Sequence, residues 1–356
     1  MTRSFLLLIA TPLLAAVLAD SSAAQARMLA PMASPRAVTT QTVGITEVTV
    51  DYSRPGLNGR HVLKDPNVVP FDNPALPWRA GANENTVISF DRNVTVGGKP
   101  LAAGSYGLHI YPKTNAAWTV MFSHNTGAWG SYTYNANEDA ARIDVMPDEG
   151  PKTERLSFDF EDLDNDGATL VLAWDTLRLP IKIGVDTTAH MVDYLNNDYT
   201  RGYGFWIAAQ QNQAAAWCDA NDVNLENALA WATRGANGAP NYNSLSVKAS
   251  LEEKLGRADA AAATRAAAEP YATEAQRNAF GYQLMSAGKL TDAIAVFTEN
   301  LEKFPNSWNA HDSLAEAYAN VGKRELAIEL YTKALELAPD DTNRQRITHV
   351  LQGLRG

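Results

Sequence analysis

Between Val38 and Val185 the chain alternates apolar and polar residues over short stretches, as in Glu47–Tyr52. Successive side chains of a β-strand point to opposite faces, so such a stretch buries one face and exposes the other. Many short stretches separated by turn-forming residues predict an antiparallel β-sandwich or barrel. The segments expected to form strands are Glu47–Tyr52, Thr86–Phe90, Val94–Val96, Ser105–Tyr111, Trp118–Ser123, Ala141–Val145, Leu156–Phe160, Thr169–Trp174 and Leu179–Ile183.

After Asp186 the spacing of apolar residues becomes helical and alanine becomes frequent. The predicted architecture is therefore an α+β multidomain protein, with the β domain first and an all-α domain after it. The expected helices before residue 270 are Met191–Asp219, interrupted near Gly202 and Gly204; Leu225–Arg234, stopped by Gly235 and Gly238; Tyr242–Leu255; and Arg257–Glu269.

Glu274–Asp341 contains two copies of one pattern, 34 residues apart. Small residues, an aromatic residue and a closing proline recur at this period, which is typical of repeated helical hairpins. Such hairpins stack into a solenoid, because one pair cannot bury its apolar face alone. The matching positions are Gly288 and Gly322, Ala293 and Ala327, Phe297 and Tyr331, and Pro305 and Pro339.

A weaker copy precedes these two. Aligning Gly256 with Gly288, an offset of 32, puts Arg265 where Phe297 stands and brings the closing proline forward to Pro270. Any match in the preceding helices is weaker still, which is usual at the end of a solenoid. At the other end, Asn343–Leu354 carries an apolar stripe and is expected to cap the array.

The first residues have the form of an export signal. Arg3 precedes an apolar run, and Ala24-Gln25-Ala26 supplies the small residues that a signal peptidase reads. We expect cleavage near Ala26 and a periplasmic or extracellular protein. The expected boundaries are a signal peptide at 1–26, an extended leader at 27–37, the β-sandwich domain at 38–185 and the helical-repeat domain at 186–356.

The formal net charge is −10, and the mature chain is equally acidic. Binding to a nucleic-acid backbone depends on lysine and arginine, so we expect no nucleic-acid partner. No later apolar run is long enough to span a membrane. The single cysteine, Cys218, cannot form an internal disulfide and is expected to be a small buried residue.

The helical half resembles tetratricopeptide repeats. The last repeat carries the resemblance in residues Leu314, Ala315, Tyr318, Gly322, Ala327, Tyr331, Ala334 and Pro339. The preceding repeat has Asn300 where an alanine is usual. The resemblance implies a surface that binds a protein or a peptide.

The β half resembles a family of exported bacterial proteins known as domain of unknown function 2911. The family has no assigned activity, and its members often carry tetratricopeptide repeats after this domain. The resemblance therefore implies architecture and export but no chemistry. The stretches that carry it are Tyr52–Gly56, Trp78–Glu84, Gly104–Tyr106, Trp118–Val120 and Trp129–Tyr132.

The candidate ligand site of the β domain is centred on Trp78, Arg79, Glu84 and His109. A guanidinium and a carboxylate beside an indole suit a small polar or carbohydrate ligand. The alternative is an internal arginine–carboxylate pair that fastens Lys64–Pro77, a loop with four prolines, to the sheet. The sequence leaves both interpretations open.

Metal and catalytic motifs are weak or missing. Asp162–Gly167 matches the first half of a calcium loop, but the twelfth position is Ala173 rather than glutamate, so an acidic hairpin turn is the better interpretation. The chain has no H-E-x-x-H, G-x-S-x-G or phosphate-binding glycine loop. We expect no metal site and no cofactor, and we favour a non-enzymatic protein.

The repeats offer a candidate peptide groove. In tetratricopeptide arrays the first helix of each pair lines the concave face, and repeats that grip a terminal carboxylate use lysine and asparagine there. This chain has Asp312 and Glu316 instead, which favours a basic or neutral peptide. The expected groove residues are Asn278, Tyr282, Met285, Asp312, Glu316 and Asn320.

Three hypotheses follow. The first is an exported, non-enzymatic protein whose repeats bind a protein or peptide partner. The second is a β domain that binds or processes a small polar or carbohydrate ligand of the cell envelope. The third is a purely structural module. The sequence does not fix the oligomeric state.

Overall fold

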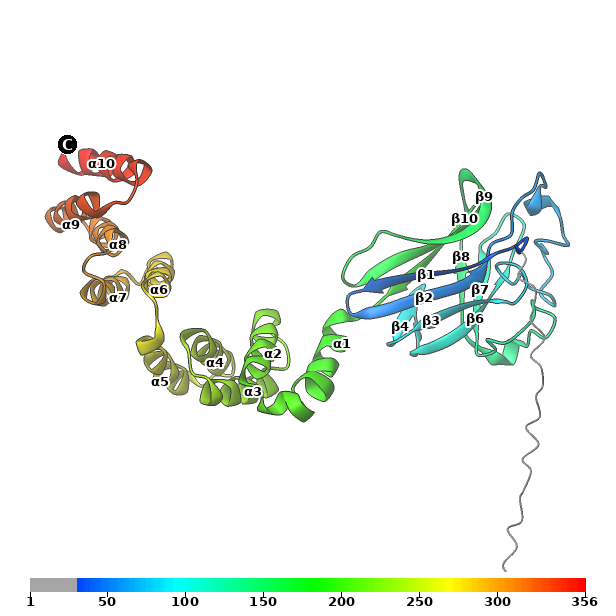
Figure 1. The fold of residues 1–356 in the computed structure, drawn as a ribbon, viewed down its shortest axis with the longest axis horizontal. Helices are drawn as coiled ribbons and strands as arrows, with labels where there is room; N and C mark the ends of the chain where they lie inside the picture. The colour runs from blue at the N-terminus through cyan, green and yellow to red at the C-terminus, as the bar shows by residue number, and fades with distance from the viewer. Residues whose placement is uncertain (1–30) are drawn as a thin grey trace, which may run out of the picture. The chain divides into compact units, whose positions relative to one another are not determined.

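The computed structural model describes residues 31–356. The chain divides into two compact units, Met1–Asp186 and Thr187–Gly356. The first unit is built of strands and the second of helices (Figure 1), so the predicted fold class is confirmed. The predicted signal peptide, residues 1–26, and leader residues 27–30 lie outside the described part of the chain.

Two antiparallel sheets form the first unit. The larger has the order β1-β2-β3-β6-β7-β8 and the smaller has the order β5-β4-β10-β9. The strands of the larger sheet are β1 (Arg36–Val43), β2 (Thr46–Ser53), β3 (Thr86–Phe90), β6 (Gly104–Tyr111), β7 (Trp118–Ser123) and β8 (Asp139–Val145). Those of the smaller sheet are β4 (Val94–Val96), β5 (Lys99–Leu101), β9 (Asp148–Glu161) and β10 (Gly167–Gly184).

The core of this unit lies between the two sheets. It takes alternate residues from each strand, such as Val48 and Val50 of β2 and Leu170 and Leu172 of β10, all fully buried. Each such side chain contributes about 1.5–3 kcal/mol by leaving water. The strand alternation in the sequence therefore predicted the core correctly.

Two details differ from the sequence expectation. The strand β1 begins at Arg36, so the last two residues of the predicted leader pair with β2. The segments Thr169–Trp174 and Leu179–Ile183 belong to one long strand, β10, with register shifts around Asp175. Asp175 has φ 56°, and a bulge of this kind lets a strand bend without ending.

The second unit is a run of helices. Figure 1 shows the pairs α6/α7 and α8/α9 as successive hairpins, followed by the single helix α10. Short 3₁₀ or π turns interrupt the chain at η3 (Leu195–Tyr199), η4 (Gly202–Trp206) and η5 (Glu269–Tyr271). The helices are α1 (Thr187–Tyr194), α2 (Ala208–Asn221), α3 (Leu225–Gly238), α4 (Tyr242–Lys254), α5 (Ala258–Ala268), α6 (Glu274–Ser286), α7 (Leu290–Lys303), α8 (Trp308–Asn320), α9 (Arg324–Leu337) and α10 (Asp341–Arg355).

The helix α3 does not stop at Gly235 as the sequence suggested. Gly235 is buried inside the helix, and a Cβ there would lie 2.0 Å from Oδ1 of Asn212 on α2. This glycine therefore allows α2 and α3 to approach closely. Its role is close packing rather than helix termination.

Four hairpins close with the same turn. Gly256, Gly288 and Gly322 have φ near +75°. At each one the glycine N–H and the next N–H donate to carbonyls near the end of the preceding helix, as in a Schellman motif. Asp222, 34 residues before Gly256, has φ 56° and makes the same pair of bonds between α2 and α3.

The pairs α2/α3, α4/α5, α6/α7 and α8/α9 are therefore four copies of one hairpin. The second helix of three pairs carries a buried aromatic residue at one equivalent position, namely Trp231, Phe297 and Tyr331. The pair α4/α5 has Arg265 there instead. The last helix, α10, buries Ile347 and Leu351 against α8 and α9, as its apolar stripe predicted.

Candidate functional site

The first-helix face of the repeats is the surface formed by α4, α6, α8 and α10, the helices that begin each pair and the last helix. Two sets of equivalent positions on these helices form one polar row: Ser246, Asn278, Asp312 and Arg346, and beside them Ser250, Tyr282 and Glu316. Successive members of this row come from neighbouring helices of the stack, so the repeat brings together side chains about 34 residues apart in sequence. All six predicted groove residues belong to α6 or α8, three to each helix.

Two interactions fix the row across helices. The Tyr282 hydroxyl donates to Oε2 of Glu316 at 2.8 Å. An Arg346 guanidinium nitrogen donates to Oδ1 of Asp312 at 2.8 Å. These bonds join α6 to α8 and α8 to α10. They hold the first helices of two repeats and the last helix in register.

Burial changes the acid–base behaviour of this row. Burial raises the pKa of the Tyr282 hydroxyl to about 12, and its bond to the Glu316 carboxylate adds to the shift. Burial also raises the pKa of the Asp312 carboxyl, although Arg346 opposes the shift. Tyr331 lies close enough to both carboxylates that burial and their charge raise its pKa.

The remaining groove residues differ in their surroundings. Asn278 is half-buried, and its Oδ1 accepts no hydrogen bond within the described part of the chain. Met285 packs partly against the cluster around Phe297, whereas Asn320 is exposed at the end of α8. The first-helix face therefore combines polar groups with one apolar side chain, which is the mixture that a peptide surface needs.

Sequence reasoning did not identify Arg346. It lies on α10, which was predicted only as a cap. The signal was present, because Arg346 follows Asp312 by the same 34 residues that separate Asp312 from Asn278. Because Arg346 neutralises Asp312, Glu316 is the carboxylate of this row without a cationic partner among the described residues.

In the β domain the four predicted ligand residues do not converge. Trp78 is 3% exposed and stacks on Trp174 in the core, with ring centroids 6.1 Å apart. His109 alternates with Leu108 and Ile110, which are in the core, so it lies on the opposite face of the larger sheet. Glu84 is exposed.

His109 anchors a loop. It is 1% exposed, and its Nδ1 lies 2.8 Å from Oγ of Ser131, which is also buried. Burial lowers the pKa of His109 to about 4, so the ring is neutral at pH 7. A neutral histidine beside a serine is the geometry of an activated nucleophile. Here both side chains are covered, and the pair fastens residues 124–138 to the sheet.

Beside this pair lies a second polar cluster that the sequence did not reveal. Oδ2 of Asp139 accepts from the Tyr134 hydroxyl at 2.7 Å and from Nε of Arg142 at 2.6 Å. Burial and the neighbouring carboxylate raise the pKa of Tyr134. The cluster closes the C-terminal end of the same loop and is consistent with a structural role.

Arg79 contacts the same loop, at Gly130 and Tyr132 on either side of Ser131 in the sequence. Its Nη1 donates to the carbonyl of Asn83 at 2.7 Å, and its guanidinium lies 5.8 Å from the ring centroid of Tyr132. Gly130 makes this approach possible, since a Cβ there would lie 2.7 Å from Cζ of Arg79. Tyr132 and Trp129 are 71% and 59% exposed. Trp78 is buried, so these two residues are the exposed aromatic side chains of this part of the β domain, and Tyr132 lies beside Arg79.

The acidic segment Asp162–Gly167 connects β9 to β10 as a turn. The Oδ1 atom of Asp164 accepts from the N–H of Asp166, and Oδ2 of Asp162 accepts from the Thr169 hydroxyl. Within residues 31–356 no group of three or more metal-ligating side chains comes together. The described chain likewise has no helix with the length and apolar character of a membrane span.

Cys218 is buried on α2, and burial raises the pKa of its thiol.

Comparison with known proteins agrees with this architecture. Residues 34–183 match the family described as "Protein of unknown function (DUF2911)", and residues 310–345 match "Tetratricopeptide repeat". No curated protein matches the chain.

Similar solved structures include YrrB, described as a TPR protein with an unusual peptide-binding site, at 19% identity, 46% coverage of this chain, 82% of that chain and a TM-score of 0.29. MamA from Desulfovibrio magneticus RS-1 matches at 16% identity, 42% and 93% coverage and a TM-score of 0.28. Both resemblances predicted from the sequence are confirmed by the family matches. The chain carries a domain of the DUF2911 family followed by tetratricopeptide repeats.

Proposed function

We propose that this is an exported, non-enzymatic protein whose first-helix face binds a peptide segment of a partner protein. The observation that carries the proposal is the row of polar side chains on α6, α8 and α10 that hydrogen bonds join from helix to helix. A surface held in register before binding loses little conformational freedom when a peptide settles on it.

The charge of the row indicates the class of peptide. Asp312 is paired with Arg346, whereas Glu316 accepts from the neutral hydroxyl of Tyr282. One uncompensated carboxylate favours a neutral or basic peptide and disfavours an acidic one. Asn278 and Asn320 supply further donors and acceptors for peptide backbone.

Export is the second part of the proposal and is supported by the sequence of residues 1–26. The test is to express the full chain and a chain lacking residues 1–26 and to compare their location by cell fractionation. We expect only the full chain to leave the cytoplasm. Equal export of both chains would remove this part of the proposal and leave peptide binding unaffected.

Peptide binding is tested with a photo-crosslinking amino acid at Asn320, in the exported chain in its own cells. We expect crosslinks to a partner peptide that mass spectrometry identifies, and loss of most of them in Glu316→Lys. The matched control is Glu329→Lys, the same charge reversal on the exposed surface of α9. If both reversals leave the crosslinks unchanged, the first-helix face is not the binding surface.

A second candidate function is favoured by Trp129 and Tyr132. Exposed aromatic rings beside an arginine suit the flat faces of a carbohydrate ligand of the envelope. Titration with N-acetylglucosamine oligosaccharides tests it. Binding that is lost in Trp129→Ala and kept in Met146→Ala, which removes another exposed apolar side chain of the same domain, would support it.

A further inference from the structure

A cavity of about 380 Å³ lies where the pair α4/α5 meets the pair α6/α7. All four helices contribute to its walls. Pockets of roughly 300–1,000 Å³ are of the size that holds ligands in proteins. A cavity of about 150 Å³ already accepts benzene. This cavity therefore has room for an aromatic side chain and the peptide group next to it.

The cavity has a sequence cause. The aromatic position that is filled by Trp231, Phe297 and Tyr331 in the other pairs is Arg265 in α5. Arg265 contributes no ring, and its guanidinium turns to the Glu253 carboxylate. The rest of α5 is mainly alanine, and none of its residues belongs to an apolar cluster of the second unit, all of which is described. One aromatic ring is missing at this junction.

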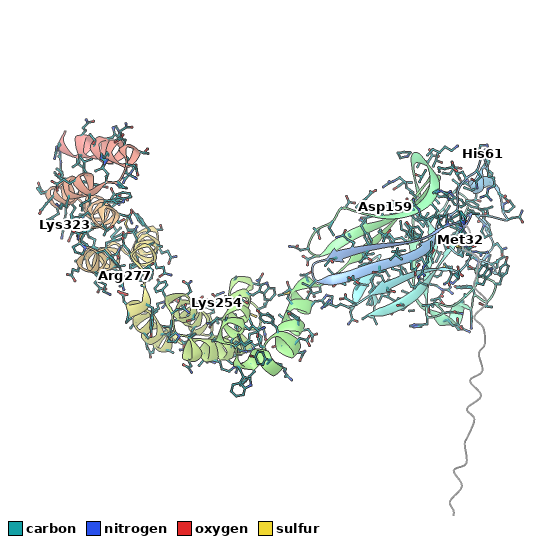
Figure 2. All side chains as sticks on the ribbon, viewed as in Figure 1. Met32, His61, Asp159, Lys254, Arg277 and Lys323 are labelled. Carbon is teal, nitrogen blue, oxygen red and sulfur yellow. The ribbon has the colours of Figure 1, made fainter. Side chains whose placement is uncertain are left out.

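A buried arginine lines the same space. Arg277 of α6 (Figure 2) lines the cavity and is only 5% exposed. It contacts the Glu269 carboxylate and donates to the Glu269 carbonyl at 2.5 Å. Its Nε finds no acceptor among the described residues and has almost no accessible surface. The bonds to Glu269 hold the side chain in place as part of the cavity wall.

The cavity continues the first-helix face. Three of its lining residues on α4 are Ser246, Ser250 and Glu253. At the offset of 32 they are equivalent to Asn278, Tyr282 and Met285, the groove residues of α6. A peptide lying along α8 and α6 therefore meets the mouth of the cavity when it reaches α4.

The charges at this junction balance, which argues against an ionic ligand. Apolar side chains such as Phe280 and Val296 complete the walls. The positive groups at or beside the cavity are Arg265, Arg277 and Lys303, and the negative groups are Glu253, Glu269 and Glu299.

We propose that this cavity is an anchor pocket for one aromatic side chain of a neutral peptide. The ring occupies the space of the missing aromatic residue of α5. The inference rests on the proposed peptide-binding function, because it adds a specificity pocket to the same face. Selectivity for an aromatic residue at one peptide position is the new property.

The direct test uses residues 27–356 and two probes, N-acetyl-phenylalanine methylamide and N-acetyl-alanine methylamide, with binding followed by ligand-observed NMR. We expect the phenylalanine compound alone to bind, and Arg265→Phe, which supplies the missing ring, to weaken it at least tenfold. Arg344→Phe on the exposed side of α10 is the matched control.

A melting curve shows whether Arg265→Phe folds, and Ala268→Leu fills the same cavity if it does not. Equal binding of the phenylalanine compound by the wild-type chain and a folded cavity-filling variant would overturn the anchor pocket.

A peptide-display selection separates this inference from the proposed function. Selected peptides that depend on Glu316 and share an aromatic residue, which Arg265→Phe no longer selects, would support both. Peptides that depend on Glu316 but share no aromatic residue would overturn the pocket and leave the binding face intact. Aromatic selection that ignores Glu316→Lys would support the pocket and contradict the proposed binding face.

Discussion

The two junctions on either side of the pair α6/α7 are built from the same repeat and differ in what fills them. Toward α8/α9 the junction is closed by Phe297, Leu314 and Ala317, all buried in one cluster. Toward α4/α5 the junction contains a cavity, an arginine with an unpaired Nε and no apolar cluster that includes α5.

The difference teaches that hairpin geometry and junction packing are separate properties of a repeat. Gly256 makes the same turn as Gly288 and Gly322, so α4/α5 is a complete hairpin. The junction between α4/α5 and α6/α7 is nevertheless poorly packed, because Arg265 replaces the aromatic residue of the other pairs. An opened junction is a place where a solenoid can bind something without changing its backbone.

The largest effect is expected at the closed junction. Phe297 is fully buried, so Phe297→Ala leaves a cavity there and should lower the free energy of unfolding by about 3–5 kcal/mol. Urea unfolding followed by helical circular dichroism measures the loss. Val296→Ala, its half-buried neighbour at the open junction, is the control and should cost under about 1 kcal/mol. Equal losses would mean that the two junctions are packed alike.

The next effect concerns the contact that Phe297 makes with α6. A Cβ at Gly281 would lie 2.4 Å from the Phe297 ring, so Gly281→Ala overpacks the pair and should cost about 1–3 kcal/mol. Adding Phe297→Leu makes room for the methyl group. If the double variant is no more stable than the sum of the single changes predicts, the glycine does not serve this contact.

The Asp312–Arg346 pair joins α8 to α10, and its contribution to the free energy of unfolding should depend on pH. Burial raises the pKa of Asp312, so the folded protein holds this proton more tightly than the unfolded chain. Ionised Asp312 therefore costs stability above its raised pKa, and the cost disappears as pH falls through that pKa. Arg346→Met removes the compensating charge and should cost about 1–2 kcal/mol at pH 7 and much less near pH 4.

Urea unfolding at pH 7 and pH 4 measures this difference. The control is Arg344→Met, because Arg344 pairs with a carboxylate of Asp341 that is 94% exposed, and such pairs contribute little. A loss for Arg346→Met that does not depend on pH would show that the carboxylate is not its cause.

The smallest effect is a gain. Asn300 is fully buried where the equivalent residues of the neighbouring pairs are Ala268 and Ala334, and its Oδ1 has no hydrogen-bond partner within residues 31–356. Asn300→Ala removes an unsatisfied polar atom and improves helix propensity, so we expect about 0.5–1 kcal/mol of added stability by urea unfolding. A measured loss would show that the Nδ2 bond to the Glu274 carbonyl is worth more than this.

The sequence predicted the helical hairpins best where their signals are local. A glycine with positive φ and the small residues around it define the turn within a few residues, so the pairs at Gly256, Gly288 and Gly322 were found. The helices that contain the pair α2/α3 gave only a weak match to the repeat, because Asp222 makes the turn in place of glycine. Aspartate can adopt this left-handed backbone conformation, but its presence in a sequence does not mark a turn as glycine does.

The candidate sites were predicted unevenly for a related reason. Trp78 lies in a loop that pairs with β6 at Ile110 and buries its ring in the core, whereas strand alternation places His109 on the other face of the larger sheet. Tyr282 and Glu316 form a hydrogen bond, because the repeat period puts them at equivalent positions of neighbouring helices.

The sequence by itself determined the two-part architecture, the strand alternation, the period of the repeats and the row of polar residues on the first helices. These features depend on residues within one turn or one repeat, where backbone sterics and side-chain period act directly. Only the tertiary structure decided that Arg346 neutralises Asp312, that Ser131 covers His109, and that a cavity opens beside Arg277. Each of these depends on which side chains from separate elements fill a shared space, and that outcome is set by packing among them all at once.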